Sequence, residues 1–146
     1  FAEIKEEHPD AVLLMAGAEE TDELRKLAED LEISESAHFL GRRSDISQLL
    51  SAMDVFIFPS FREGLPVSVV EAQAAGLPVL MSDTVTDEVC ITDHIKRLSI
   101  DVDPKVWAKE IETMPDDLRA AADEKIRECG WDIADRAKTL IEFYER

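Results

Sequence analysis

Hydrophobic and polar residues follow one another along the chain in two alternating patterns. Short apolar runs bounded by glycine or proline are typical of strands that are buried on both faces. Segments with apolar residues three or four positions apart are typical of amphipathic helices. The predicted strands are residues 11–16, 37–40, 55–58, 79–81 and 97–100. The predicted helices are residues 1–7, 21–31, 44–53, 66–75, 104–112, 117–129 and 132–145, with a short helical turn at 86–89.

This order of elements predicts a Rossmann-like α/β fold. Five short strands that alternate with helices favour one parallel sheet with helices on both faces. Such sheets bind ligands at the carboxyl ends of their strands. The loops expected to carry chemistry are therefore those that follow the first four strands, which are residues 17–20, 41–43, 59–65 and 82–86.

Composition narrows the class of protein. The 146 residues carry 16 basic and 33 acidic side chains, a net charge of −17, which argues against a nucleic-acid partner. No apolar stretch approaches the roughly 20 residues of a membrane span. The two cysteines, Cys90 and Cys129, are too few for a metal motif or a disulfide framework and suit a reducing compartment. We expect one soluble domain located in the cytoplasm.

The most informative segment is the loop and helix after the third predicted strand. Glu63 and Gly64 lie in the loop, and Pro66 is suited to the first position of the helix, whose free N–H groups favour an anion. Glu71 is predicted on an apolar stripe of that helix, about 7–8 Å beyond Pro66 along the axis. The stripe is formed with Val67, Val70 and Ala74. A ligand with several hydroxyl groups would suit two such carboxylates, but the residues alone also allow a solvated helix acid and a loop acid.

Residues 58–79 contain Phe-Pro-Ser-x-x-Glu-Gly-Leu-Pro-x-x-x-x-Glu-Ala-x-Ala-x-Gly-x-Pro-Val. This E-x7-E pattern resembles the retaining GT-B glycosyltransferases that use nucleotide sugars, with the closest likeness to those of capsule and exopolysaccharide synthesis. The likeness covers nearly the whole chain. It includes residues 8–17, 38–50, 82–89 and 130–133. The resemblance implies the C-terminal, donor-binding half of such an enzyme, with transfer from a nucleotide diphosphate sugar to an acceptor hydroxyl.

The resemblance also assigns roles to residues of this chain. Glu63 falls on the catalytic glutamate, which contacts and orients the transferred sugar, and Glu71 on the glutamate that contacts the nucleotide ribose. Backbone groups near Gly64 and Leu65 would hold sugar or phosphate oxygens. The nucleotide base would lie against the turn formed by Gly41, Arg42 and Arg43 and would contact mainly its backbone. Gly17 would leave room for the nucleotide. We expect a UDP-sugar donor and no required metal.

Two parts of the family pattern are expected to be missing. The opening strand and its glycine-rich loop, which carries Arg and Lys, would precede Phe1, and so would the acceptor domain. Residues 1–146 are therefore predicted to be a single nucleotide-sugar-binding domain, truncated at its N-terminus and inactive alone. Its expected partners are the nucleotide sugar and the acceptor domain, and membrane contact through that domain is left open. Arg62 is interpreted as a surface residue rather than a phosphate ligand.

The sequence also allows other interpretations. A sugar-nucleotide epimerase or a phosphorylase of the same architecture is the alternative enzyme, and a phospho-receiver module is the non-enzymatic alternative. Asp101-Val-Asp103 matches a metal-binding D-x-D pattern, but Asp103 before Pro104 is explained by a helix N-cap. Three aromatic residues at helical spacing are predicted to pack in the core, namely Trp107, Trp131 and Phe143.

Overall fold

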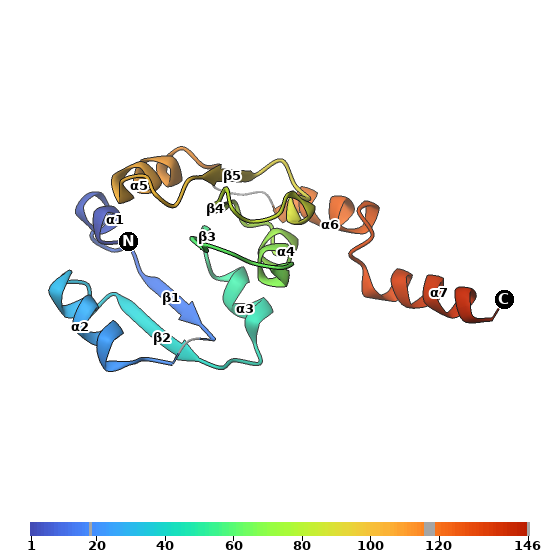
Figure 1. Ribbon diagram of the computed structural model, residues 1–146, viewed down its shortest axis with the longest axis horizontal. Coiled ribbons are helices and arrows are strands. Elements are labelled where there is room, and N and C mark those ends of the chain that lie inside the picture. The colour runs from blue at the N-terminus through green and yellow to red at the C-terminus, as the bar shows by residue number, and fades with distance from the viewer. Residues whose placement is uncertain (18, 116–118, 146) are drawn as a thin grey trace.

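The computed structural model describes residues 1–17, 19–115 and 119–145 of the chain (Figure 1). Strands and helices alternate in the predicted order. The strands are β1 (Leu13–Ala16), β2 (Ala37–Gly41), β3 (Phe56–Phe58), β4 (Val79–Ser82) and β5 (Ile95–Leu98). The α-helices are α1 (Ala2–Glu7), α2 (Asp22–Asp30), α3 (Ile46–Ser51), α4 (Val67–Ala74), α5 (Pro104–Glu112), α6 (Arg119–Glu128) and α7 (Ile133–Tyr144), with a 3₁₀ turn, η1 (Asp87–Val89).

All strand pairs are parallel, as predicted, but the strands form two sheets. β1 pairs with β2, and β3, β4 and β5 pair in that order. The prediction of one five-stranded sheet is wrong, because no ladder joins the two sheets within the described residues. In Figure 1 the β1–β2 pair lies apart from β3. The alternation of elements predicts parallel strands, whereas the pairing of two particular strands depends on contacts that local pattern does not encode.

The last strand begins two residues earlier than predicted. Ile95 pairs with Val79 of β4, so the strand includes Lys96 and Arg97. Both polar side chains are engaged: Lys96 forms an ion pair with Glu110 of α5, and Arg97 binds the loop after β4. Because these partners lie on other elements, the sequence alone does not show why a strand contains two charged residues. The start of the strand is therefore missed by a search for apolar runs.

The main core surrounds β4, whose four residues are all buried. Side chains from α3, α4 and the segment after β4 pack against it. The buried members are Leu50, Val69, Val70, Ala72, Leu77, Val79, Met81, Val85, Val89 and Ile91. Ala28, Ile33 and Ala37 form a smaller cluster beside β1 and β2. The core therefore holds α4 firmly against β3 and β4, which fixes the direction of the helix that carries Glu71.

The ends of two helices test predictions from the sequence. α4 begins one residue later than predicted, since Pro66 is its extended N-cap and Val67 its first residue. Gly76, two residues past the end of α4, has φ of +75°, the left-handed conformation typical of a helix C-terminus, as predicted. The carboxylate of Asp103 accepts a hydrogen bond of 2.8 Å from the N–H of Lys105. Asp103 thus caps α5.

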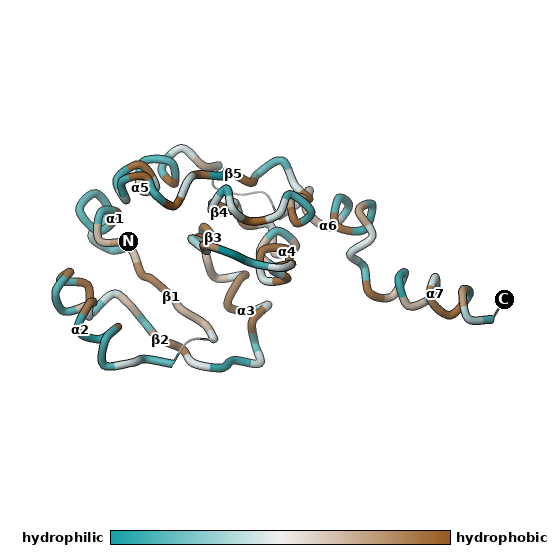
Figure 2. Tube along the Cα trace, in the orientation of Figure 1, coloured by the Kyte–Doolittle hydropathy of each residue, from teal (hydrophilic) through white to brown (hydrophobic). Residues whose placement is uncertain are grey.

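α7 extends away from the rest of the chain (Figure 1). Hydrophobic stretches run along it in Figure 2, yet none of its residues is buried. The prediction that Phe143 packs in the core is wrong, since it is 72% exposed and contacts the ring of Tyr144 edge to face. Trp107 is partly buried and donates its indole N–H to the Ser99 carbonyl over 3.1 Å, and Trp131 packs partly against the main core.

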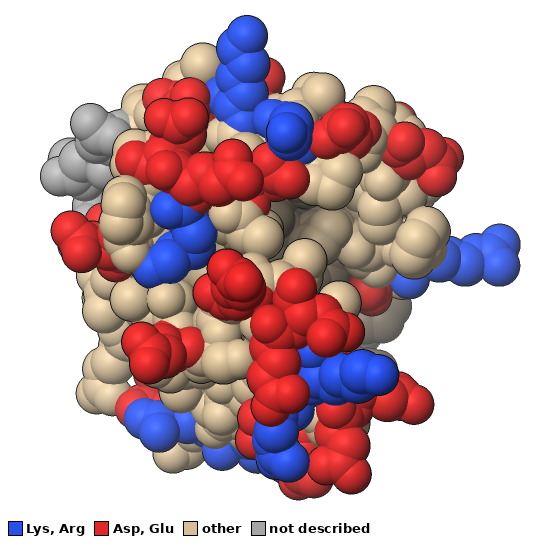
Figure 3. Space-filling view, turned by 90° about the vertical axis from the view of Figure 1, so that its left-hand side faces the viewer, with Lys and Arg blue, Asp and Glu red and all other residues tan. Residues whose placement is uncertain are grey.

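An apolar cavity of about 220 Å³ lies where α1 approaches α5. Its walls include Phe1, Ile4, Ile57, Trp107 and Ile111. The face shown in Figure 3 is hollowed near its middle and carries many acidic side chains around the hollow. Among the described residues, no helix is both long and apolar enough to cross a membrane.

Candidate functional site

Glu63 lies in the exposed loop between β3 and α4. The hydroxyl of Ser60 donates a hydrogen bond of 2.8 Å to Oε1 of Glu63. The carbonyl of Ser60 in turn accepts hydrogen bonds from Ser82 and from Thr84, the latter over 2.9 Å. The loop that carries Glu63 is therefore tied to the loop after β4, and one oxygen of the carboxylate has a fixed donor.

Glu71 is exposed, and its predicted place on a packed face is wrong. The buried side of α4 consists of Val69, Val70, Ala72 and Gln73, whereas Val67 and Ala74 are exposed with Glu71. Nearly every residue of this helix is small or apolar, so the spacing of apolar residues did not reveal which side the core would cover. An exposed carboxylate needs no internal donor, and Glu71 is therefore free to accept hydrogen bonds from a ligand.

The surface around the two glutamates carries exposed apolar side chains. Phe61 is 75% exposed, and Leu65 and Val67 are about half exposed. Gly64 lies between them, with no atom within 4 Å of the position that a Cβ would occupy. Three apolar side chains and an open glycine give a ligand both area for contact and access to the backbone beside Glu63.

Gly17 and Gly41 meet at the carboxyl ends of β1 and β2. The N–H of Gly17 donates to the carbonyl of Gly41 over 2.7 Å. Both residues have positive φ, +91° and +59°, and at neither does any atom lie within 4 Å of the place where a Cβ would be. The structure thus brings together two of the predicted nucleotide-binding residues and leaves open space beside them.

The two arginines after Gly41 differ in their surroundings. Arg43 binds Asp45 with both Nε and Nη2, over 2.8 and 2.6 Å. These hydrogen bonds and the charge of Arg43 hold the pKa of the Asp45 carboxyl below its usual range. Arg42 is exposed, and no ion pair involves it within the described part of the chain. With its charge balanced by Asp45, Arg43 offers a ligand mainly its backbone.

The predicted site residues therefore fall into two groups. One is the pair of glycines with Arg42 and Arg43, at the end of the β1–β2 sheet, and the other is the Glu63 loop with α4. No hydrogen bond among the described residues joins the two groups. Arg62 is exposed, as predicted, and forms no ion pair within the described ranges. Whether one ligand reaches both groups stays a prediction.

Gln73 is an important residue that the sequence pattern did not reveal. It is 1% exposed. Its Nε2 donates to the carbonyls of Val69 and Val89, and its Oε1 accepts from the N–H groups of Ile91 and Thr92. The sequence feature that could have indicated its role is a single amide side chain in a helix of mostly small and apolar residues. Gln73 fastens α4 to the segment between η1 and β5 and so stabilises the helix that presents Glu71.

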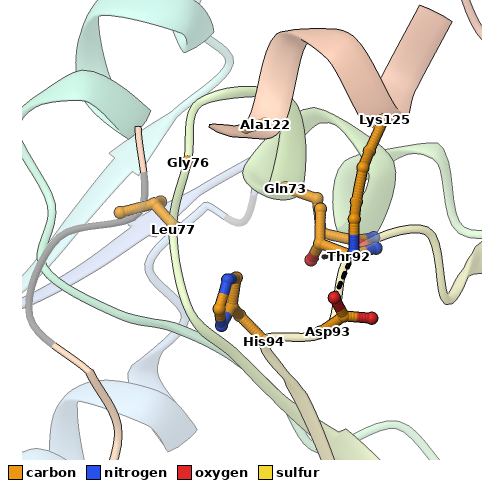
Figure 4. A pocket seen from close by; sticks show the side chains of 8 residues that line it. All are labelled: Gln73, Gly76, Leu77, Thr92, Asp93, His94, Ala122 and Lys125. Atoms are coloured by element: carbon orange, nitrogen blue, oxygen red, sulfur yellow. Dashed lines mark hydrogen bonds and ion pairs between the residues drawn. The ribbon is translucent and has the colours of Figure 1, made fainter. Parts of the chain in front are cut away.

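A cavity of about 100 Å³ lies beside Gln73, at the opposite end of α4 from Glu63. Lys125 and Asp93 form an ion pair at its edge (Figure 4). Thr92 and His94 also line it. Neither this cavity nor the apolar one near α1 is lined by Glu63 or Glu71.

The described residues contain no group of three or more His, Cys, Asp or Glu placed to hold a metal ion. Asp103 of the D-x-D pattern is used as a helix cap. Asp103 therefore has a structural role here.

Comparison with known proteins finds one family, one relative and two solved structures to which this chain is similar. The profile of the family described as "Glycosyl transferases group 1" matches residues 1–128. A protein of Bacillus subtilis (strain 168) named as a glycosyltransferase, EpsF, is 37% identical over 116 residues, which cover 73% of this chain and 29% of EpsF. The chain thus spans under a third of that relative.

Two solved structures share the fold. WaaG, a glycosyltransferase involved in lipopolysaccharide biosynthesis, superposes with a TM-score of 0.69 at 24% identity, over 87% of this chain and 36% of WaaG. The pneumococcal O-GlcNAc transferase GtfA, in complex with UDP and GlcNAc, gives a TM-score of 0.75 at 20% identity, over 99% of this chain and 32% of GtfA. The predicted α/β fold is confirmed.

Proposed function

The chain belongs to the group 1 glycosyl transferases, and from this membership we propose that it forms the donor-binding part of a retaining glycosyltransferase for surface polysaccharide synthesis. The similarity to EpsF supports glycosyl transfer, and the similarity to WaaG supports a role in lipopolysaccharide or other surface polysaccharide synthesis. The E-x7-E spacing of Glu63 and Glu71 supports retention of anomeric configuration, and the coupling constant of the anomeric proton in the product tests it.

The observation that carries the proposal is the exposure of both glutamates around the start of α4. Glu71 stands five residues beyond Pro66, about 7–8 Å along the helix axis. A nucleotide sugar that lies across the helix start would place ribose hydroxyls at Glu71 and sugar hydroxyls at Glu63. Ser60 already donates to one oxygen of Glu63, so the other oxygen is available to the sugar.

Binding of the donor diphosphate requires positively charged groups, and the two groups of site residues contain few of them. All three arginines of the two groups are exposed, but Arg43 is balanced by Asp45, whereas Arg42 and Arg62 form no ion pair within the described residues. N–H groups at the start of α4 and around Gly64 would add fixed dipoles directed at phosphate or sugar oxygens. Against a net charge of −17, these groups support weak, salt-sensitive binding of the donor.

Glu63 is proposed to orient the sugar and to stabilise the positive charge that develops on its ring as the diphosphate leaves. The bond between the anomeric carbon and the diphosphate breaks, the bond to the acceptor oxygen forms on the same face, and the proton of the acceptor hydroxyl passes to the leaving diphosphate. A carboxylate in open solvent contributes little to such stabilisation, because water screens its charge. We therefore propose that turnover requires an acceptor domain that, together with the bound donor, covers Glu63 and excludes water from it.

Isothermal titration of the chain with UDP-GlcNAc, and with GDP- and ADP-sugars, tests the proposal. Glu71→Gln is expected to weaken binding of the preferred donor about three- to tenfold, because a carboxylate accepts stronger hydrogen bonds than an amide. Glu112→Gln on α5 is the matched control, since it makes the same change of charge at an exposed helix position. Equal effects of the two substitutions, or no binding of any donor, would contradict the proposal.

A further inference from the structure

A chain of hydrogen bonds leads from Arg97 on β5 to Glu63. The Nη2 of Arg97 donates to the carbonyls of Asp83 and Val85, over 2.6 and 2.7 Å. Its Nη1 pairs with Asp87. One guanidinium therefore holds the backbone on both sides of Thr84 and closes the loop after β4 into a fixed shape.

The loop held in this way supports the Glu63 loop through its hydroxyl groups. Thr84 donates to the carbonyl of Ser60 over 2.9 Å, and the fully buried Ser82 donates to the same oxygen. The two donors occupy both lone pairs of that carbonyl, which restricts how residue 60 can turn. The hydroxyl of Ser60 then donates to Oε1 of Glu63 over 2.8 Å.

We propose that Arg97 and Thr84 are positioning residues for Glu63: Arg97 fixes Thr84, Thr84 fixes Ser60, and Ser60 sets the direction of the Glu63 carboxylate. This inference rests on the proposed function, in which Glu63 contacts the transferred sugar and not the nucleotide. Precise placement matters at this carboxylate because it is exposed and the core does not hold it. Without this chain of hydrogen bonds, the Glu63 side chain rotates freely. Hydrogen bonding to the sugar hydroxyls must then offset the conformational entropy that the side chain loses on binding.

The test compares two ligands, UDP and UDP-GlcNAc, by titration calorimetry. The affinity that the sugar adds is the ratio of the two dissociation constants. Thr84→Val keeps the shape of the side chain and removes its hydroxyl, and it is expected to weaken UDP-GlcNAc binding about three- to tenfold while UDP binding changes less than about twofold. Thr84→Ser restores the hydroxyl and is expected to restore the ratio. Arg97→Gln is expected to act like Thr84→Val.

Two controls separate positioning from a general loss of structure. Thr86→Val, in the same loop, removes a hydroxyl whose contact is the N–H of Glu88 and is expected to leave the ratio unchanged. Glu63→Gln is expected to abolish most of the affinity that the sugar adds. In the Glu63→Gln background, Thr84→Val is expected to have no further effect, because it acts through Glu63.

The outcomes distinguish this inference from the proposed function. If Glu63→Gln lowers the ratio and neither Thr84→Val nor Arg97→Gln does, the positioning inference is overturned and the proposed function stands. A loss of affinity for UDP equal to that for UDP-GlcNAc in Thr84→Val would also overturn it. If the wild-type chain binds no UDP-, GDP- or ADP-sugar, or if Glu63→Gln leaves both affinities unchanged, the proposed function fails and the inference fails with it.

Discussion

Gly17 donates its backbone N–H to the carbonyl of Gly41 over 2.7 Å, and both glycines have positive φ. The hydrogen bond continues the β1–β2 ladder past Ala16 and holds the two strand ends together. Both glycines are predicted nucleotide-binding residues, and open space surrounds the position of a Cβ at each of them. A substitution there tests backbone conformation without a steric clash.

Gly17→Ala and Gly41→Ala are each expected to lower the free energy of unfolding by about 1–2 kcal/mol, the cost of a left-handed conformation for an L-residue. Gly64→Ala is the matched control. Its Cβ position is equally open and its φ lies outside the left-handed region, so we expect a change within about 0.5 kcal/mol. Urea unfolding followed by circular dichroism measures all three, and equal costs would contradict the conformational argument.

Gln73→Leu is expected to destabilise the chain by about 2–5 kcal/mol, because the carbonyl of Val89 and the N–H groups of Ile91 and Thr92 lose their partner. Leucine has a similar size, so the cost comes from unpaired polar groups and not from a cavity. Gln48→Leu, at an exposed position of α3, is the control and should change stability by less than about 0.5 kcal/mol. Urea midpoints that match for the two variants would show that the buried amide is dispensable.

The ion pair of Arg43 and Asp45 predicts a dependence on pH. Arg43 lowers the pKa of Asp45 in the folded chain. A lowered carboxyl pKa stabilises the fold above the unfolded value of about 3.9, and this stabilisation is lost as the pH falls through the folded value. Arg43→Gln should therefore destabilise the chain at pH 7 and progressively less below about pH 4.

Arg42→Gln provides the comparison, since no ion pair involves Arg42 within the described residues. Its effect on the thermal midpoint should stay constant over the same range of pH. Added salt should reduce the effect of Arg43→Gln at pH 7, because the pair is exposed. A difference between Arg43→Gln and wild type that grows as the pH falls would contradict the assignment.

Local patterns in the sequence predicted most of the elements and several of their ends. Pro66 and Gly76 mark the limits of α4, and Asp103 caps α5, since caps depend on residues within one turn. The last strand begins two residues earlier than the sequence predicts. Lys96 and Arg97 interrupt the apolar pattern of this strand, because their side chains bind Glu110 of α5 and the loop after β4.

Features that depend on distant contacts were not predicted. Which side of α4 the core covers is decided by β3, β4 and α6, and this placed Glu71 on the exposed side. The roles of Gln73 and Arg97 come from hydrogen bonds with distant backbone carbonyl and N–H groups, which have no signature in the sequence. The roles of Glu63 and Glu71 in binding a donor stay predictions, since they depend on a ligand.

Amide chemical-shift mapping with UDP-GlcNAc tests directly whether Glu63 and Glu71 bind the donor. We expect the ¹H–¹⁵N signals of Glu63, Gly64, Leu65 and residues 67–71 to shift in proportion to bound ligand. Signals of Thr92 and Lys125, beside the cavity at the other end of α4, should stay in place. Shifts confined to that cavity, or no shifts near Glu63 and Glu71 at saturation, would contradict the claim that these two glutamates bind the donor.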